Sequence, residues 1–208
     1  MRLLPYGDRA ILVELPDFAA RRRLDAALRR TPLESVVEHV PGANTVLVRV
    51  AEASALERVA AGLRALPVEE GAPEASSTGS RVVEIGVRYD GADLAEVAGH
   101  LSLSVEEVVA RHAGQTWTVE FSGFAPGFGY LVGEQGGLDV PRRESPRTRI
   151  PTGAVALAGP FTGVYPRPSP GGWQLIGSTE ERMWDETRQP PALFTPGTRV
   201  RFVEVSRG

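Results

Sequence analysis

The sequence contains no cysteine and no lysine. Without cysteine, the chain can form no disulfide bond, no catalytic thiolate and no metal centre built on thiolates. Without lysine, it can form no Schiff base, and it cannot contain a lysine-dependent phosphate loop. Any anion clamp must therefore use arginine, whose guanidinium can pair with carboxylate or phosphate through two hydrogen bonds.

The sequence also lacks an excess of positive charge and long apolar segments. Its formal net charge is −3 at pH 7, whereas a general nucleic-acid-binding protein needs a basic surface. No run approaches the roughly 18 apolar residues of a membrane-spanning helix. The N-terminal residues lack a long apolar region followed by a small-residue cleavage site, so no signal peptide is predicted. We expect a cytoplasmic protein that binds neither nucleic acid nor membrane.

The first 88 residues alternate between β-prone and helical patterns. Strands are predicted at residues 10–15, 34–40, 45–50 and 81–88, and helices at 17–30 and 54–66. The second helix is predicted to begin with a capping box formed by Ser54 and Glu57. The order strand–helix–strand–strand–helix–strand is typical of a ferredoxin-like α+β domain, which we place at residues 1–88. The small polar residues 69–80 are predicted to form a mobile loop.

Residues 89–208 begin with two short helices and continue as β-structure. Asp93 is predicted to cap the first helix, and Ser104 with Glu107 to form a capping box on the second. The pair resembles a DNA-binding helix-turn-helix only superficially, because Glu106 and Glu107 would repel phosphates. The remaining sequence alternates short β-prone runs with turns rich in proline and glycine, which indicates a closed or nearly closed barrel. We therefore expect a helix-covered, mainly-β domain.

Three loops between residues 120 and 177 contain the candidate binding residues. In the first loop, aromatic rings could wall a pocket, while small residues let a ligand approach the backbone. The candidates there are Phe124, Pro126, Gly127 and Tyr130. The second loop reads PRRESPR, and its prolines stiffen the presentation of Arg142 and Arg147. The third loop, SPGGW, could expose backbone donors beside an indole ring through Gly171, Gly172 and Trp173.

Each of these loops also has a structural interpretation. The first could be a packed barrel corner, the second a set of solvated surface arginines, and the third a glycine turn beside a buried tryptophan. His112 is a candidate proton carrier, and its structural alternative is a packed or capping histidine at a helix end. The spacing of the three histidines fits no metal motif, so no metal site is predicted in this chain.

Four segments together resemble a known family. They read FAPGFGYL at residues 124–131, PRRESPRTRIPTG at 141–153, TGVYPRPSPGGWQLIG at 162–177 and PPALFTPGTRVRF at 190–202. They are similar to the B subunit of the bacterial ATP-dependent 5-oxoprolinase. The same family is called allophanate hydrolase subunit 1 and includes the histidine-kinase inhibitor KipI. Phe161 departs from the pattern, because a glutamine commonly occupies that position in the family.

The resemblance implies a fold, a reaction and partners. The fold is a ferredoxin-like domain followed by a cyclophilin-like β-barrel. The reaction is the ATP-driven opening of 5-oxoproline, a small lactam, to glutamate, with ATP as a co-substrate of the complex. The partners are two further proteins of the 5-oxoprolinase. The larger C subunit, similar to allophanate hydrolase subunit 2, joins the B subunit in a hetero-oligomer, and the A subunit completes the enzyme. The chain is expected to be inactive alone.

The resemblance also leaves two alternatives open, a carboxyltransferase subunit of the urea-carboxylase type and a KipI-like histidine-kinase inhibitor. For the enzymatic functions, Arg142 and Arg147 are expected to hold an anionic group, either the substrate carboxylate or a transferred phosphate. The aromatic loop would wall the site, and His112 would orient the substrate or carry a proton.

Overall fold

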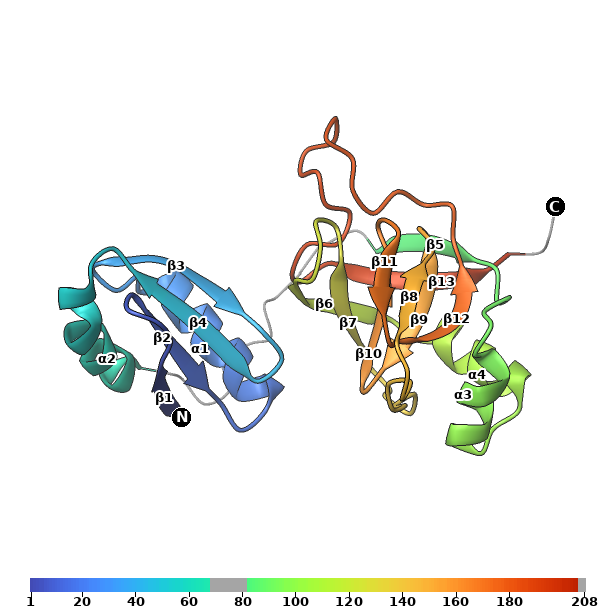
Figure 1. The fold of residues 1–208 in the computed structure, drawn as a ribbon, viewed down its shortest axis with the longest axis horizontal. Helices are drawn as coiled ribbons and strands as arrows, with labels where there is room; N and C mark the ends of the chain where they lie inside the picture. Colours follow the sequence, from blue (N-terminus) through green and yellow to red (C-terminus); the bar gives the residue numbers. More distant parts are fainter. Residues whose placement is uncertain (68–81, 206–208) are drawn as a thin grey trace. The chain divides into compact units, whose positions relative to one another are not determined.

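The computed structural model describes residues 1–67 and 82–205 of the chain (Figure 1). The chain divides into two compact units, Met1–Ser76 and Ser77–Gly208. The loop predicted at residues 69–80 lies outside the described residues. Within the described ranges, no helix combines the length and the hydropathy that crossing a membrane requires.

Unit 1 is a four-stranded antiparallel sheet with two helices packed against it. The strands follow the order β1-β2-β4-β3. The elements are β1 (Arg2–Pro5), β2 (Ala10–Glu14), α1 (Phe18–Arg30), β3 (Val36–Pro41), β4 (Thr45–Val50), the short 3-10 helix η1 (Ala53–Ala55) and α2 (Leu56–Ala65). Alternate strand residues such as Val13 and Val48 are buried with Leu24 of α1 and Leu63 of α2 in one core.

The local predictions for unit 1 are largely confirmed. Both helices form, and β3 and β4 pair as the predicted hairpin. The N-cap of α1 is Asp17, whose side chain accepts a hydrogen bond from the backbone N–H of Ala20 at 2.7 Å. The capping box predicted at Ser54 and Glu57 is wrong. Ser54 lies inside η1, where its hydroxyl donates to Glu52 instead, so α2 begins from a 3-10 turn without a side-chain cap.

The strand predicted at residues 81–88 does not join the sheet of unit 1. It forms β5 (Val83–Val87), which pairs in parallel with β13 (Arg199–Glu204) in the sheet of unit 2. The edge position next to β2 is taken instead by β1, a strand that the sequence pattern does not reveal. The predicted partner of this strand is wrong because an alternating pattern identifies the buried face of a strand and not its neighbour.

Unit 2 contains a seven-stranded sheet that curls into a nearly closed barrel, as predicted. Its strand order is β12-β9-β10-β7-β6-β13-β5, and β8 pairs with β11 separately. At the two edges, Arg88 and Ser178 exchange two backbone hydrogen bonds of 2.9 and 2.8 Å. The remaining elements are α3 (Leu94–Leu101), α4 (Val105–Ala113), β6 (Trp117–Ser122), β7 (Gly129–Gly133), β8 (Arg147–Ile150), β9 (Ala154–Ala158), β10 (Phe161–Val164), β11 (Ser169–Gly171) and β12 (Gln174–Ser178).

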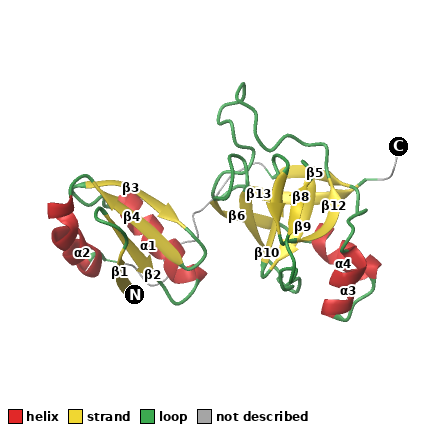
Figure 2. Cartoon of the chain, viewed as in Figure 1, coloured by secondary structure: helices red, strands yellow, loops and turns green. Residues whose placement is uncertain are grey.

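The two helices α3 and α4 lie side by side at one end of this sheet (Figure 2). The predicted capping box on α4 is present, because the Ser104 N–H donates to Glu107 at 2.7 Å and the Glu107 N–H donates back at 3.1 Å. Val97 of α3 and Val108 of α4 are fully buried in the main core of unit 2. The helices therefore cover the barrel, which is the role predicted for them.

Strand β9 separates two apolar clusters of unit 2. Its residues Val155 and Leu157 belong to the main core with the helices, whereas Ala154, Ala156 and Ala158 belong to a second cluster rich in aromatic rings. Successive strand residues point to opposite faces, so both faces of β9 are buried. The small alanine side chains leave room for large rings on the second face, and this is where the candidate site begins.

Candidate functional site

Seven aromatic side chains pack together in this second cluster, which we call the aromatic cluster. They are Phe121, Phe124, Phe128, Tyr130, Phe161, Tyr165 and Trp173. The ring centroid of Phe128 lies between 5.1 and 5.3 Å from four of the others, mostly in the edge-to-face geometry that ring quadrupoles favour. The structure thus brings together the predicted residues Phe124, Tyr130 and Trp173. The ring centroids of Phe161 and Tyr130 lie 5.6 Å apart, so Phe161 is part of this cluster.

Pro126 and Gly127 shape the exposed end of this cluster. The N–H of Phe128 donates to the carbonyl of Ala125 at 2.9 Å and closes a four-residue turn. Gly127 has φ +84°, which suits the third position of a type II turn. Phe124 has φ +65°, a conformation that costs a residue with a side chain roughly 1–2 kcal/mol, and its side chain is 57% exposed. The loop therefore holds one aromatic ring in solvent despite a backbone cost.

Arg142 lies in a loop whose backbone is tied to the segment that leads into β12. The carbonyl of Pro141 accepts a hydrogen bond from Gln174 at 3.4 Å. The N–H of Arg143 donates to the carbonyl of Gly172 at 2.8 Å. Both chain neighbours of Arg142 are thus anchored, while its own side chain is exposed and makes no hydrogen bond or ion pair within residues 1–67 and 82–205.

The arginine loop lies next to the aromatic cluster, because Gly172, which accepts the hydrogen bond from Arg143, precedes Trp173. Burial raises the pKa of Tyr130 and raises that of Tyr165 to about 12, and the positive charge of Arg142 opposes both increases. Gly171 lies against the same tyrosine, because a Cβ atom at this glycine would stand 2.5 Å from the hydroxyl oxygen of Tyr165. The arginine loop (residues 141–147), the SPGGW turn and the aromatic cluster are therefore neighbours, and Phe124 is the exposed ring of the cluster.

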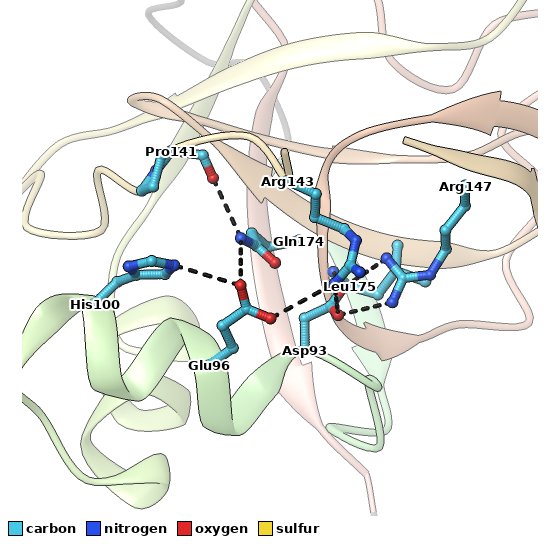
Figure 3. Close-up of polar contacts among 8 residues, drawn as sticks. All are labelled: Asp93, Glu96, His100, Pro141, Arg143, Arg147, Gln174 and Leu175. Atoms are coloured by element: carbon cyan, nitrogen blue, oxygen red, sulfur yellow. Dashed lines mark hydrogen bonds and ion pairs between the residues drawn. The ribbon is translucent and has the colours of Figure 1, made fainter. Parts of the chain in front are cut away.

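Arg143 and Arg147 bind a buried carboxylate, that of Asp93 (Figure 3). Arg147 donates from Nη1 to Oδ2 at 2.8 Å and from Nη2 to Oδ1 at 2.7 Å. Arg143 donates from Nη1 to Oδ1 at 2.7 Å, and the N–H of Leu175 donates to Oδ2 at 2.7 Å. The Asp93 side chain is only 3% exposed. This fork-to-fork arrangement is the strong, charge-assisted form of an arginine–carboxylate pair.

Asp93 is not among the candidate site residues. It occupies the predicted N-cap position of α3, but its side chain makes no capping hydrogen bond there. Burial alone would raise the pKa of Asp93, but hydrogen bonds from Arg147 and Leu175 and the charges of both arginines outweigh it and lower the pKa. The carboxylate is therefore ionised at neutral pH. Its arginine partners lie 50 and 54 residues away in the sequence, which is why no local motif could reveal the pairing.

The same network continues along α3. Glu96 lies 3.5 Å from Nη1 of Arg143, 3.5 Å from the ring of His100 and 3.5 Å from the amide nitrogen of Gln174 (Figure 3). Gln174 is 1% exposed, and its amide oxygen has no hydrogen-bond partner among the described residues. The arginine loop is thus fixed to α3 and β12 by polar contacts, of which those of Asp93 and Gln174 involve buried side chains.

His112 lies in the main core and not at this surface. Its side chain is fully buried, its Nδ1 is 2.8 Å from the hydroxyl of Tyr89, and its Nε2 is 2.9 Å from the hydroxyl of Thr162. Burial lowers the pKa of His112 to about 3, so the ring is neutral at physiological pH. Phe161 and Thr162 are consecutive in β10 and point to opposite faces, so His112 is separated from the aromatic cluster by the sheet. This arrangement matches the alternative interpretation of His112 as a packed histidine.

Two open cavities lie elsewhere on the described chain. One of about 200 Å³ is lined by Gly86, Arg88, Ser178, Thr179, Glu180, Glu181 and Val205. The other, of about 270 Å³, belongs to unit 1 and is lined by residues that include Leu15, Leu24 and Leu63. Neither contains a residue of the aromatic cluster or the arginine loop. Among the described residues, no group of three or more histidine, aspartate or glutamate side chains could hold a metal ion.

The chain matches a family of carboxyltransferase domains. The family described as carboxyltransferase domain, subdomain C and D, matches residues 1–194. The B subunit of 5-oxoprolinase from Escherichia coli O157:H7 is 42% identical over 97% of this chain and 95% of its own length. The chain belongs to this family, that of the 5-oxoprolinase B subunits, and the resemblance stated from its motifs is confirmed.

Solved structures show the same fold. TTHA0988 is 38% identical over 96% of this chain with a TM-score of 0.73, and the match covers 40% of that longer chain. The urea carboxylase of Kluyveromyces lactis matches 98% of this chain and 22% of its own length with a TM-score of 0.72. Its identity is 18%, so this second likeness concerns the fold alone.

Proposed function

We propose that this chain is the B subunit of an ATP-dependent 5-oxoprolinase and acts with the C and A subunits to open 5-oxoproline to glutamate. The observation that supports this most directly is the 42% identity to a 5-oxoprolinase B subunit over nearly the full length of both chains. In the reaction, one water adds across the lactam C–N bond. Hydrolysis of ATP consumes a second water and releases ADP and phosphate.

The chemistry of the surface supports a ligand of this kind. 5-Oxoproline has a flat lactam ring and one carboxylate. The rings of Phe124 and Tyr130 would contact the lactam, supported by the buried Trp173 packed against Tyr130. The guanidinium of Arg142, which has no partner among the described residues, would bind the carboxylate. The turns that contain Pro126, Gly127, Gly171 and Gly172 would let the ligand approach the backbone. Arg147 and His112, whose hydrogen bonds are satisfied inside the chain, would support this surface indirectly.

ATP is proposed as a co-substrate of the complex. Because the chain has no lysine, the ATP phosphates would be held by arginines and backbone donors, shared with the partner proteins. The proposed surface is open, and its outermost ring is that of Phe124. An open surface supports a site that is completed by the C subunit in a hetero-oligomer, and hence a chain that is inactive alone. The complex is proposed to act in the cytoplasm.

The finer fold assignment is also a proposal. If the last strand of a ferredoxin-like βαββαβ order is moved to the front, the result is ββαββα, and the order β1-β2-β4-β3 in unit 1 supports this permuted form. For unit 2, the curled antiparallel sheet with helices at one end supports a cyclophilin-like barrel.

The proposal is tested by producing the chain together with candidate C and A subunits. The purified complex is supplied with ATP and 5-oxoproline, and the release of phosphate and the formation of glutamate are measured. We expect glutamate only when both substrates are present. A stable complex that forms no glutamate contradicts the proposal.

A carboxyltransferase subunit of the urea-carboxylase type is the second candidate. It is favoured by the family description and by the fold of the Kluyveromyces lactis urea carboxylase. This candidate requires a carboxylated biotin carrier as the donor. Transfer of labelled carboxylate from such a carrier to urea by the chain and its partner, in the absence of 5-oxoproline cleavage, would select it over the first.

A further inference from the structure

Three arginines lie within seven residues of the arginine loop, and they have different surroundings. Arg143 and Arg147 share the carboxylate of Asp93, and their side chains are 27% and 24% exposed. Arg142 is exposed and has no hydrogen-bond or ion-pair partner in the described parts of the chain. One loop thus contains two arginines with an internal anion and one arginine without.

Asp93 connects the arginine loop, which contains Arg142, to the start of α3 and to β12. Its backbone N–H donates to the carbonyl of Leu175 at 3.0 Å, and the N–H of Leu175 donates back to its carboxylate. The same carboxylate accepts three hydrogen bonds from Arg143 and Arg147. The start of α3, the arginine loop and β12 are therefore joined at a single, almost fully buried group.

An external anion would not displace Asp93 easily. Displacement would leave the buried carboxylate of Asp93 without its charged partners, which is costly. The Nη donors of Arg143 and Arg147 would also lose their hydrogen bonds to it. Arg143 and Arg147 are therefore poor candidates for a direct ligand contact. Arg142 differs, since its exposed guanidinium has no hydrogen-bond or ion-pair partner among the described residues. The loop that carries it is bonded from Arg143 to Gly172, which precedes Trp173 of the aromatic cluster.

We propose that Asp93 is a positioning residue that holds Arg143 and Arg147 within the loop, so that Arg142 is the one of the loop's three arginines that presents its guanidinium to the carboxylate of the ligand. The ligand class is a small, flat-ringed carboxylate, whose ring would lie against Phe124 and Tyr130. Its identity as 5-oxoproline rests on the proposed function. Arg142 determines the preference for a carboxylate, and Asp93 acts through Arg142.

The test compares 5-oxoproline with 2-pyrrolidone, which has the same lactam ring and no carboxylate. Dissociation constants for both are measured on the complex with the C and A subunits by ligand-observed NMR. Arg142→Ala should weaken 5-oxoproline binding about 10- to 100-fold, as expected for loss of a charge-assisted pair, and leave 2-pyrrolidone binding unchanged. The control is Arg201→Ala, which removes an exposed arginine of β13 and should change neither constant.

Asp93→Asn keeps the shape of the side chain but removes its charge. We expect it to lower the preference for 5-oxoproline over 2-pyrrolidone roughly 5- to 10-fold. In the Arg142→Ala background, it should cause no further loss of preference, because its effect passes through Arg142. If Asp93→Asn does not fold, Arg143→Ala removes one of the ties and should shift the preference in the same direction.

The outcomes separate this inference from the proposed function. A wild-type complex that does not bind 5-oxoproline overturns the proposed function and, with it, the identity of the ligand. A wild-type complex that binds 5-oxoproline, together with an Arg142→Ala complex that retains the preference, overturns this inference alone. An Asp93→Asn complex that unfolds at a lower temperature but keeps the full preference limits Asp93 to a structural role and overturns its assignment as a positioning residue.

Discussion

The buried imidazole of His112 makes the stability of unit 2 depend on pH. In the folded chain its pKa is lowered from 6.5 to about 3 by burial. Below pH 6.5, His112 therefore binds a proton in the unfolded chain but not in the folded chain. The stabilisation is complete above pH 6.5 and is lost progressively as the pH falls toward 3. Between pH 7.5 and pH 5 we expect a loss of about 2 kcal/mol in the free energy of unfolding.

Urea unfolding at these two pH values measures this loss. The matched variant is His112→Gln, which keeps hydrogen-bonding capacity in the side chain but cannot take up a proton in this range. The variant is expected to be less stable at pH 7.5 and to show a flatter pH dependence. An equal loss in both proteins would mean that another group causes the pH effect.

Two glycines of unit 2 provide a test of close packing at the level of single atoms. A Cβ atom at Gly171 would lie 2.5 Å from the hydroxyl oxygen of Tyr165 and 2.9 Å from Cδ1 of Ile150, whereas a Cβ at Gly99 in α3 meets nothing within 4 Å. Gly171→Ala should therefore destabilise the protein by about 1–3 kcal/mol through overpacking. Gly99→Ala should stabilise it by up to about 1 kcal/mol through helix propensity. Thermal unfolding measures whether each substitution raises or lowers the stability of the protein. A Gly171→Ala variant as stable as the wild type would argue against tight contact with the tyrosine.

At the scale of elements, β5 is the strand whose position departs most from expectation. Ile85 and Val87 are 0% exposed in the core of unit 2, and burying such side chains contributes about 1.5–3 kcal/mol each. A fragment of residues 77–208 should therefore unfold cooperatively at a higher temperature than a fragment of residues 89–208, which lacks β5. Circular dichroism during heating compares the two. Equal midpoints would show that β5 is not needed for this sheet.

A matched pair of substitutions in the full chain tests the same strand. Ile85→Ala removes a fully buried side chain and should lower the free energy of unfolding by about 2–5 kcal/mol. Glu84→Ala changes the neighbouring exposed residue and should alter it by less than about 0.5 kcal/mol. A similar effect of both substitutions would contradict the burial of one face of β5.

The elements that the sequence predicts are those set by local chemistry. The capping box of Ser104 and the hairpin of β3 and β4 depend on residues that are close in the chain, and both are present. The partner of β5 and the pairing of Asp93 with Arg147 depend on residues far apart in the chain. No spacing rule connects these residues, so neither the pairing of β5 with β13 nor the pairing of Asp93 with Arg147 could be predicted.

The candidate site, like the fold, can be predicted from the sequence only in part. The aromatic residues between Phe124 and Trp173 do come together, because large apolar rings favour edge-to-face packing against one another. For His112 the sequence does not decide between a position in the core and a position in the site, since a single histidine in a helical pattern fits either. In the structure its ring contacts Thr162, whose side chain faces the main core because side chains alternate along β10. This contact exists only once the sheet is assembled.

At the scale of the whole molecule, the chain is expected to need partner proteins for turnover. Within the described residues, Arg147 is engaged by Asp93, His112 is enclosed in the core, and Phe124 stands in solvent at the edge of the aromatic cluster. A hydrolytic site has to control the access of water to its reacting groups, and an open surface cannot do so. A second chain that covers this surface would supply both the enclosure and the missing catalytic groups.

The purified chain alone should therefore release no more phosphate from ATP, in the presence of 5-oxoproline, than a reaction without protein. Adding only the C subunit should produce a complex on gel filtration, and then adding the A subunit should restore glutamate formation. Phe124→Ala removes the exposed ring from the surface to be covered, and we expect it to raise the KM for 5-oxoproline in the complex. The same substitution should leave the unfolding temperature of the isolated chain nearly unchanged, because this side chain is mostly in solvent. Turnover by the isolated chain would show that its own residues complete the site.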